Sequence, residues 1–170
     1  MKIGKSLNIT LTIPQWSVLL AIKAGIKYIF LEWGRGSGKT TILGYIIKKM
    51  VQQMPRASFA MVGSTYMQIL SKTLPSAKEG LEMFGIYEDV DYVVGRCGKK
   101  KGFEMPFQPP SKWDNIIHFS NGTIFQLVSL DRPDSGRGLN SFGEVGDEAT
   151  LLDYEKLYNN VMTTNRAKKE

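Results

Sequence analysis

Gly34-Arg35-Gly36-Ser37-Gly38-Lys39-Thr40 is the stretch of sequence that decides the fold. It follows a short apolar run, Tyr28-Ile29-Phe30-Leu31, which we interpret as a buried strand, and it opens a segment from Thr40 to Gln53 with apolar residues at helical spacing. Strand, glycine-rich turn and helix in this order are the context of a phosphate-binding loop. Glycines let backbone N–H groups approach phosphate oxygens, and the helix N-terminus adds partial positive charge. The sequence therefore predicts an anion site here.

Three side chains of this loop suit nucleotide chemistry. The Lys39 ammonium can reach the β- and γ-phosphates, and the Thr40 hydroxyl can bind Mg²⁺. Arg35 is a candidate contact to the γ-phosphate, because a guanidinium pairs with two phosphate oxygens; the alternative is an arginine that points to solvent. One position departs from the usual pattern, whose first glycine would fall at Trp33.

The acidic pair Asp147-Glu148 ends a strand-like segment late in the chain. In this position an aspartate can hold Mg²⁺, and an adjacent glutamate can orient and deprotonate the attacking water. The two glycines and the glutamate of residues 143–146 are poor for a central strand, so an exposed acidic pair in a loop is the alternative. With the phosphate loop upstream, we favour the catalytic interpretation.

The remaining segments indicate an α/β fold. Phe59-Ala60-Met61-Val62 predicts a second buried strand, and residues 67–83 predict a helix that Pro75 breaks or kinks. Residues 116–128 carry Asn121-Gly122 between two apolar runs, which predicts a β-hairpin. Residues 90–112 are rich in glycine and proline and are interpreted as a long loop or insertion. A helix is expected from Pro14, which a first helical turn tolerates, through about Ala24, and another short helix is expected after Leu152.

Composition adds weaker constraints. The chain has 170 residues, one cysteine (Cys97) and a formal net charge of +6, which suits an anionic partner such as nucleic acid but is common on protein surfaces. A single cysteine excludes an internal disulfide. Charged residues interrupt the most apolar stretch, so we expect no membrane span, and the N-terminus does not have the pattern of a signal peptide.

Taken in order, these motifs resemble the large terminase subunits of tailed double-stranded DNA phages, over most of the chain outside residues 90–112. Ile13-Pro14-Gln15 looks like the adenine-recognising glutamine motif of that family, and residues 34–40 match its phosphate loop. Residues 65–68 look like the segment after its second strand, and residues 121–124 and 131–138 look like the hairpin and the arginine–glycine loop before its acidic motif. Asp147-Glu148-Ala149 matches that acidic motif.

The resemblance implies a P-loop NTPase fold of the type with a separate catalytic glutamate (ASCE type). It implies a mostly parallel central sheet flanked by helices, with a β-hairpin before the acidic motif. The expected activity is ATP hydrolysis that drives double-stranded DNA into a capsid, in the cytoplasm of the infected bacterial host. The implied cofactors are ATP and Mg²⁺. The implied partners are DNA, the portal protein, the small terminase subunit and further copies in a ring.

The candidate site residues follow from these motifs and from the resemblance. The catalytic candidates are Glu148 and Arg35, and the metal ligands are Thr40 and Asp147. Arg137 is a candidate contact to phosphate or a neighbouring subunit, with turn stabilisation as an equal alternative. The candidate ATP-binding residues are Gln15, Gly34, Arg35, Gly36, Ser37, Gly38, Lys39, Thr40 and Thr41. For Gln15, adenine recognition and a polar role at a helix start are equally good interpretations.

Several questions stay open at this point. The family continues with a coupling motif, further strands and a nuclease domain, so the resemblance implies that residues 1–170 are an incomplete ATPase domain that hydrolyses ATP poorly alone. Another P-loop motor such as a helicase, or a nucleotide-binding module without turnover, is the alternative function. His118 fits a core position better than a catalytic one. Lys99-Lys100-Lys101 are interpreted as a solvated loop, with contact to DNA phosphates as the alternative.

Overall fold

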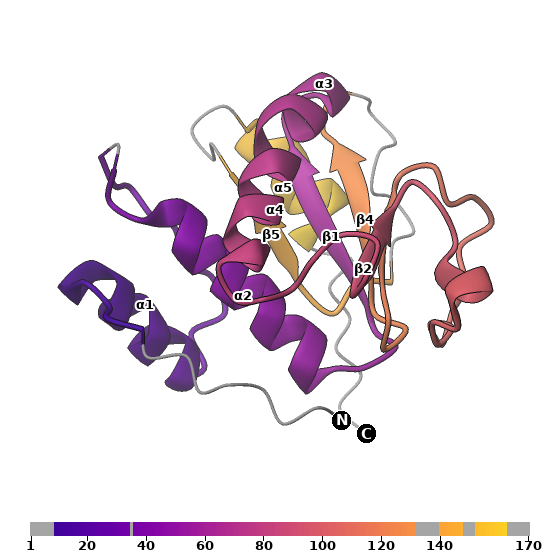
Figure 1. Cartoon of the computed structure of the whole chain (residues 1–170). Helices are drawn as coiled ribbons and strands as arrows, with labels where there is room; N and C mark the ends of the chain where they lie inside the picture. The colour runs from indigo at the N-terminus through magenta and orange to yellow at the C-terminus, as the bar shows by residue number, and fades with distance from the viewer. Residues whose placement is uncertain (1–8, 35, 132–139, 148–151, 163–170) are drawn as a thin grey trace.

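The computed structural model describes residues 9–34, 36–131, 140–147 and 152–162 (Figure 1). The elements in chain order are α1 (Ile13–Lys23), α2 (Lys39–Gln53), β1 (Ser58–Gly63), α3 (Tyr66–Gln68), the π-helical turn η1 (Ile69–Thr73), α4 (Leu74–Glu82), β2 (Tyr92–Val94), the 3₁₀ turn η2 (Gly98–Lys101), β3 (Ile116–Phe119), β4 (Ile124–Ser129), β5 (Glu144–Gly146) and α5 (Tyr154–Asn160). Among the helices in these ranges, none has both the length and the apolar character that a membrane crossing requires.

The described strands form one mixed sheet in the order β2-β3-β4-β1-β5. β1 is parallel to β4 and β5, while β3 is antiparallel to β2 and β4. The predicted α/β class, the buried strand at 59–62 and the hairpin are thus confirmed, but the expected mostly parallel sheet is wrong. The hairpin itself explains the error, because strands joined by a tight turn must run antiparallel.

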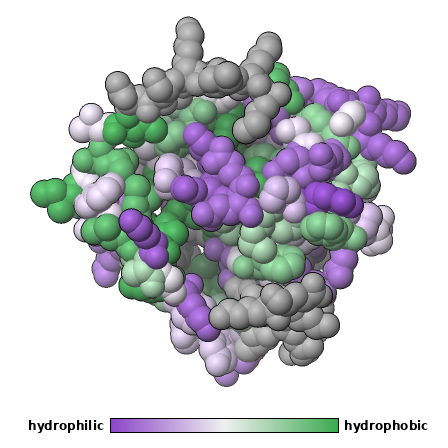
Figure 2. Space-filling model, turned by 90° about the horizontal axis from the view of Figure 1, so that it is seen from below, coloured by the Kyte–Doolittle hydropathy of each residue, from purple (hydrophilic) through white to green (hydrophobic). Residues whose placement is uncertain are grey.

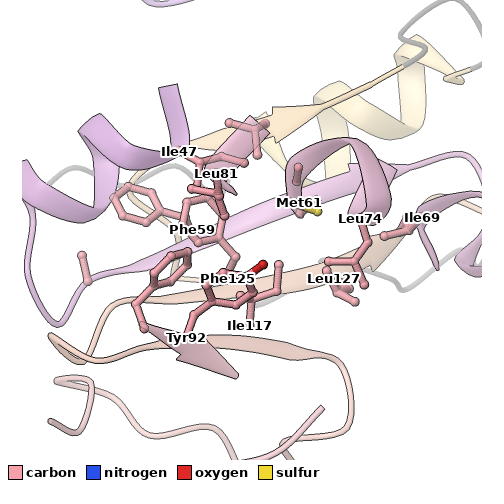
Figure 3. Close-up of a cluster of buried hydrophobic side chains, with 14 residues drawn as sticks. Ile47, Phe59, Met61, Ile69, Leu74, Leu81, Tyr92, Ile117, Phe125 and Leu127 are labelled. Atoms are coloured by element: carbon pink, nitrogen blue, oxygen red, sulfur yellow. The ribbon is translucent and has the colours of Figure 1, made fainter. Parts of the chain in front are cut away.

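Both faces of β1 are covered. Phe59 and Met61 face one way and join the core shared with α2 and α4, which Figure 3 shows with Ile47, Leu81 and Phe125 around them. Ala60 and Val62 alternate with them and belong to a second cluster on the opposite face, against Leu157 of α5. A strand buried on both faces is an uninterrupted apolar run, which is why its sequence predicted it well.

The helical segment after β1 contains the predicted irregularity near Pro75. The π-helical turn η1 lies between α3 and α4, and the proline occupies the first turn of α4, where a missing N–H costs little. α4 then crosses α2 at two glycines. A Cβ on Gly80 would lie 2.5 Å from the Thr40 carbonyl oxygen and 2.9 Å from the Gly44 Cα atom, so this close crossing requires glycine.

The apolar run Tyr28–Leu31 is not a strand, which corrects the sequence interpretation. Within the described residues it pairs with no other strand, and Tyr28 and Phe30 are 51% and 61% exposed. The run does alternate between more and less exposed side chains, as an extended segment does. An apolar pattern predicts extension and burial, but a strand also needs a neighbour to pair with, and none of the described strands lies beside this one.

Residues 90–112 contain more regular structure than the loop expected there. β2 pairs with β3 at the edge of the sheet, and η2 follows it. Arg56 holds the later part of the segment, since its Nε donates to the Met105 carbonyl (2.8 Å) and its guanidinium lies over the Phe107 ring. The glycine and proline content predicted turns correctly but concealed a three-residue strand.

His118, a residue of β3, holds the same segment against the sheet through two hydrogen bonds. The side chain is fully buried; its Nδ1 accepts from the Gly98 N–H (2.9 Å), so Nε2 carries the proton and donates to the Glu104 carbonyl (2.8 Å). The Trp113 and Phe103 rings lie against the imidazole. The interpretation of His118 as a core residue rather than a catalytic one agrees with this environment.

The burial of His118 predicts acid-sensitive stability. Burial lowers its pKa below the ordinary 6.5, and the bond to the Glu104 carbonyl offsets this only partly. The unfolded state therefore binds a proton at higher pH than the folded state. The stability contributed by the neutral His118 side chain is fully present above about pH 6.5 and is lost as the pH drops below that value. We expect the melting temperature to decrease between pH 7 and 5, as measured by circular dichroism.

The control is His118→Gln, which cannot titrate. Because His118 is the only histidine, no other side chain with an ordinary pKa changes charge in this range. The variant should have a lower melting temperature at pH 7, but its melting temperature should decrease less between pH 7 and 5. Equal losses in the two proteins would show that His118 does not cause the acid sensitivity.

Candidate functional site

The described residues of the loop, 34 and 36–38, are closed by hydrogen bonds at the start of α2. The Ser37 hydroxyl donates to the Gly34 carbonyl (2.7 Å), and the Lys39 ammonium donates to the Trp33 carbonyl (3.0 Å). Gly36 and Gly38 have φ angles of 75° and 81°, in the left-handed region that favours glycine. The glycines of the motif are therefore used for backbone conformation. Trp33, at the place of the usual first glycine, contributes only a carbonyl to this closure.

The first turn of α2 presents backbone donors without internal acceptors. Its N-cap is Gly38, which has no side chain to accept from the helix N-terminus, and the first turn has no acidic residue. The first helical bond runs from the Ile42 N–H to the Gly38 carbonyl (3.1 Å). Within the described residues, the N–H groups of Lys39, Thr40 and Thr41 have no acceptor. The geometry of such a helix end suits an anion.

The sequence of this turn is poor for helix stability and good for binding an anion. A lysine at the first position opposes the helix dipole, and two threonines follow it, which have low helix propensity. A serine or aspartate N-cap would also give the helix a side-chain acceptor, worth a few tenths of a kcal/mol over glycine, yet glycine stands there. The space beside Gly34 and Gly36 is open, with no atom within 4 Å of a Cβ built on either. The residues thus fit a phosphate group.

Gln15 lies against this loop from α1. The side chain is 5% exposed; its Nε2 donates to the Gly38 carbonyl (3.1 Å), and its Oε1 accepts from the Thr12 N–H (2.9 Å). Thr12 and Gln15 form a capping box at the start of α1. The structure thus brings residue 15, a predicted nucleotide-site residue, beside the loop. Both ends of its amide, however, already have protein partners.

Several other predicted site residues either lie on α2 with contacts to α4 or fall outside the described residues. The Thr41 hydroxyl points to the Met83 sulfur (3.4 Å) and so toward α4 rather than toward the loop. Thr40 lies in the first turn with its carbonyl against Gly80. Arg35 falls outside the described residues, as do Glu148 and Arg137.

The described part of the acidic pair lies at the carboxyl end of the sheet. Asp147 follows β5 directly, and β5 is parallel to β1 and β4, so the carboxyl ends of all three meet at one edge. α2 leads into β1 through residues 54–57, which puts the end of α2 near the start of β1 and its first turn toward the opposite, carboxyl end. Figure 1 shows the loop on the β5 side of the sheet.

This carboxyl edge carries polar side chains that the sequence analysis did not single out. Gln68 is buried and accepts from the Ser64 N–H (2.9 Å), directly after β1. Ser129, the last residue of β4, donates to the Asp131 carboxylate. The signal that could have found them is their position just after buried parallel strands, where ligands bind in open α/β sheets.

A Mg²⁺ ion held by the described residues would have few protein ligands. Among the described residues there is no group of three histidine, cysteine, aspartate or glutamate side chains that could enclose a metal ion. Mg²⁺ usually keeps several waters and takes one or two protein oxygens plus substrate phosphates. The Thr40 hydroxyl and the Asp147 carboxylate are suitable oxygens for that arrangement.

A hollow of about 650 Å³ lies elsewhere, lined by Arg96, Cys97, Lys99 and Lys100. The segment around η2 that carries these residues lies on the opposite side of the molecule from α1 in Figure 1. Lys101 is turned to Asp89, where its ammonium donates to the carbonyl (2.6 Å) and the carboxylate (3.1 Å). Lys99 and Lys100 are exposed, as the interpretation of a solvated loop expects.

Comparison with known proteins assigns the chain to no family: no family model matches it, and no match was found among curated proteins or among solved structures.

Proposed function

We propose that this chain binds ATP with Mg²⁺ at the start of α2 and hydrolyses it as the motor domain of a DNA-translocating machine similar to a terminase large subunit. The observation that carries the proposal is the set of unpaired N–H groups of Lys39, Thr40 and Thr41, above a loop closed by Ser37 and Lys39. The helix end is built at a cost in helix stability, which a bound phosphate would offset.

The proposed roles follow from the chemistry of each group. Backbone N–H groups and the Lys39 ammonium hold the β- and γ-phosphates. Thr40 and Asp147 would hold Mg²⁺, which would supply positive charge to neutralise the phosphates. Glu148 orients a water molecule and accepts its proton as the water oxygen attacks the γ-phosphorus, and the bond to the β-phosphate oxygen breaks. Arg35 and Arg137 remain candidates for stabilising the charge that develops on the transferred phosphoryl group.

The partners of this function are also proposals. The resemblance suggests double-stranded DNA, the portal protein, the small terminase subunit and a ring of copies, in the cytoplasm of an infected bacterium. The net charge of +6 suits DNA, and a motor that grips the phosphate backbone without reading bases should lose affinity steeply as salt rises.

Glu148→Gln tests hydrolysis. The amide keeps the size of the side chain but cannot accept the water proton. We expect the variant to bind ATP–Mg²⁺ with unchanged affinity. Its rate of ATP hydrolysis should be lower than that of the unsubstituted chain by about a hundredfold or more. Binding is measured by calorimetry, and phosphate release is measured with and without duplex DNA.

The matched control is Glu155→Gln, the same chemical change on the exposed first turn of α5. It should leave both binding and turnover unchanged. Turnover retained in Glu148→Gln would assign the water to another residue. Tight ATP binding by the unsubstituted chain without any turnover, even when DNA is present, would favour a nucleotide-binding module instead.

A further inference from the structure

The Gln15 side chain is built into the phosphate loop rather than left free for a base. Nε2 bonds to the Gly38 carbonyl and Oε1 bonds to the Thr12 N–H. Reading adenine would require the oxygen and nitrogen of the amide to face the base together, as paired donor and acceptor. In this structure the two ends face two parts of the protein, and the side chain is 5% exposed.

The bond to Gly38 acts on the peptide unit that begins α2. The Gly38 carbonyl accepts from Ile42 N–H, as the first bond of the helix, and from Gln15 Nε2. The Lys39 N–H belongs to the same planar, trans peptide unit and therefore points opposite to that carbonyl. Fixing the carbonyl with two bonds fixes the direction of the Lys39 N–H, which is one of the unpaired donors of the anion site.

The packing at Gly38 supports the same conclusion. A Cβ atom on Gly38 would collide with the Gln15 Nε2 atom, and Gly38 also has a φ of 81°. Glycine at this position therefore serves two needs, a left-handed turn and room for the glutamine. The amide of residue 15 fills the space behind the loop and prevents the peptide from rotating.

We propose that Gln15 is a positioning residue for the phosphate loop, and that it contributes to affinity for the triphosphate and not to selection of the base. This rests on the nucleotide site of the proposed function. It follows that α1 is a structural support of that site, because the residue that starts the helix also holds the loop.

Three ligands separate the two roles of Gln15. ATP, GTP and inorganic tripolyphosphate, each with Mg²⁺, share the phosphates and differ in the base. Gln15→Met keeps the length of the side chain and removes both hydrogen bonds. Loss of one net hydrogen bond of about 1 kcal/mol predicts an affinity about fivefold lower for each of the three ligands, by the same factor.

Thr12→Ala is the matched control. It removes the hydroxyl of the capping box and weakens the start of α1, but it leaves the Thr12 N–H and the bond from Gln15 to Gly38 in place. Affinity for all three ligands should equal that of the unsubstituted chain. Calorimetry is done at a temperature where circular dichroism shows each protein folded, so that a loss of stability alone does not alter binding.

Each outcome decides the proposal. An equal decrease for the three ligands in Gln15→Met, with none in Thr12→Ala, supports it. A decrease for ATP alone overturns it in favour of adenine recognition. No decrease, or an equal decrease in both variants, also overturns it, because Gln15 then only stabilises α1. If the unsubstituted chain binds none of the ligands, the nucleotide site itself is wrong, and the proposal is overturned with it.

Discussion

Lys39→Ala should lower the affinity for ATP–Mg²⁺ about a hundredfold or more and leave the melting temperature nearly unchanged. Among the described residues from Gly34 to Lys39, the Lys39 ammonium is the only charged side-chain group, and its Nζ lies 3.0 Å from the Trp33 carbonyl oxygen. From there it can turn to a phosphate, where each charge-assisted hydrogen bond contributes about 1.5–3 kcal/mol. Two such bonds account for the expected decrease. Isothermal titration calorimetry measures it.

The fold should tolerate this change because Lys39 does not stabilise α2. A positive side chain in the first turn opposes the helix dipole, so its removal offsets the lost bond to Trp33. Lys49→Ala, on the same helix, removes the same charge far from the loop and serves as the control. An ATP affinity that is equal in the two variants would contradict the phosphate-loop assignment.

Gly80→Ala should destabilise the protein by about 3 kcal/mol, although alanine is the better helix former by about 1 kcal/mol. The added Cβ would meet the Thr40 carbonyl oxygen at 2.5 Å and the Gly44 Cα at 2.9 Å, which are backbone atoms that no rotamer change can move. α2 and α4 must separate, and the core around Ile47 and Leu81 must loosen. For a chain of this size the melting temperature should fall by roughly 6–12 °C.

The sign of this change is itself diagnostic. Propensity alone predicts stabilisation, so a higher melting temperature for Gly80→Ala would show that the helices do not touch at this point. Gly44→Ala should have the same sign, since its Cβ would meet the Gly80 backbone. The double variant should cost less than the sum of the two, because one separation of the helices relieves both contacts.

The sequence predicted those elements whose evidence is local. The apolar run of β1, the two runs around Asn121-Gly122 and the helical spacing of residues 40–53 each encode their own conformation. The run at Tyr28–Leu31 has as strong a pattern, yet it forms no strand, because pairing depends on residues elsewhere. For the same reason β2 was missed: it has only three residues, and its evidence is the partner strand β3.

The site was predicted in part, for similar reasons. Glycines and a lysine before a helix predict an anion site because the pattern is contained in seven consecutive residues, and the structure places the start of α2 and its unpaired N–H groups there. The role of Gln15 depends on a contact 23 positions away, which no local pattern contains. One local signal was available and not used: Thr12-x-x-Gln15 has the spacing of a capping box, which places the amide at the start of α1. Similarly, Gly44 and Gly80 within helical patterns indicated a close crossing.

The exposed apolar surface on the α1 side has a consequence for the protein in solution. Ile13, Trp16 and Leu20 of α1 are 84%, 54% and 48% exposed, and Tyr28 and Phe30 add to them. In Figure 2 hydrophobic residues gather on the left, the side on which α1 lies in Figure 1. Surfaces of this kind attract one another, and the net charge of +6 opposes the attraction.

Salt therefore acts on this protein in two opposite directions. It screens the repulsion between copies, since the Debye length falls from about 10 Å at 0.1 M to about 3 Å at 1 M, and so it brings the apolar surfaces together. The same salt releases any polyanion held by charge alone. The osmotic second virial coefficient should become more negative as salt is added, so that the conditions which free the protein from nucleic acid during purification are those in which it is least colloidally stable.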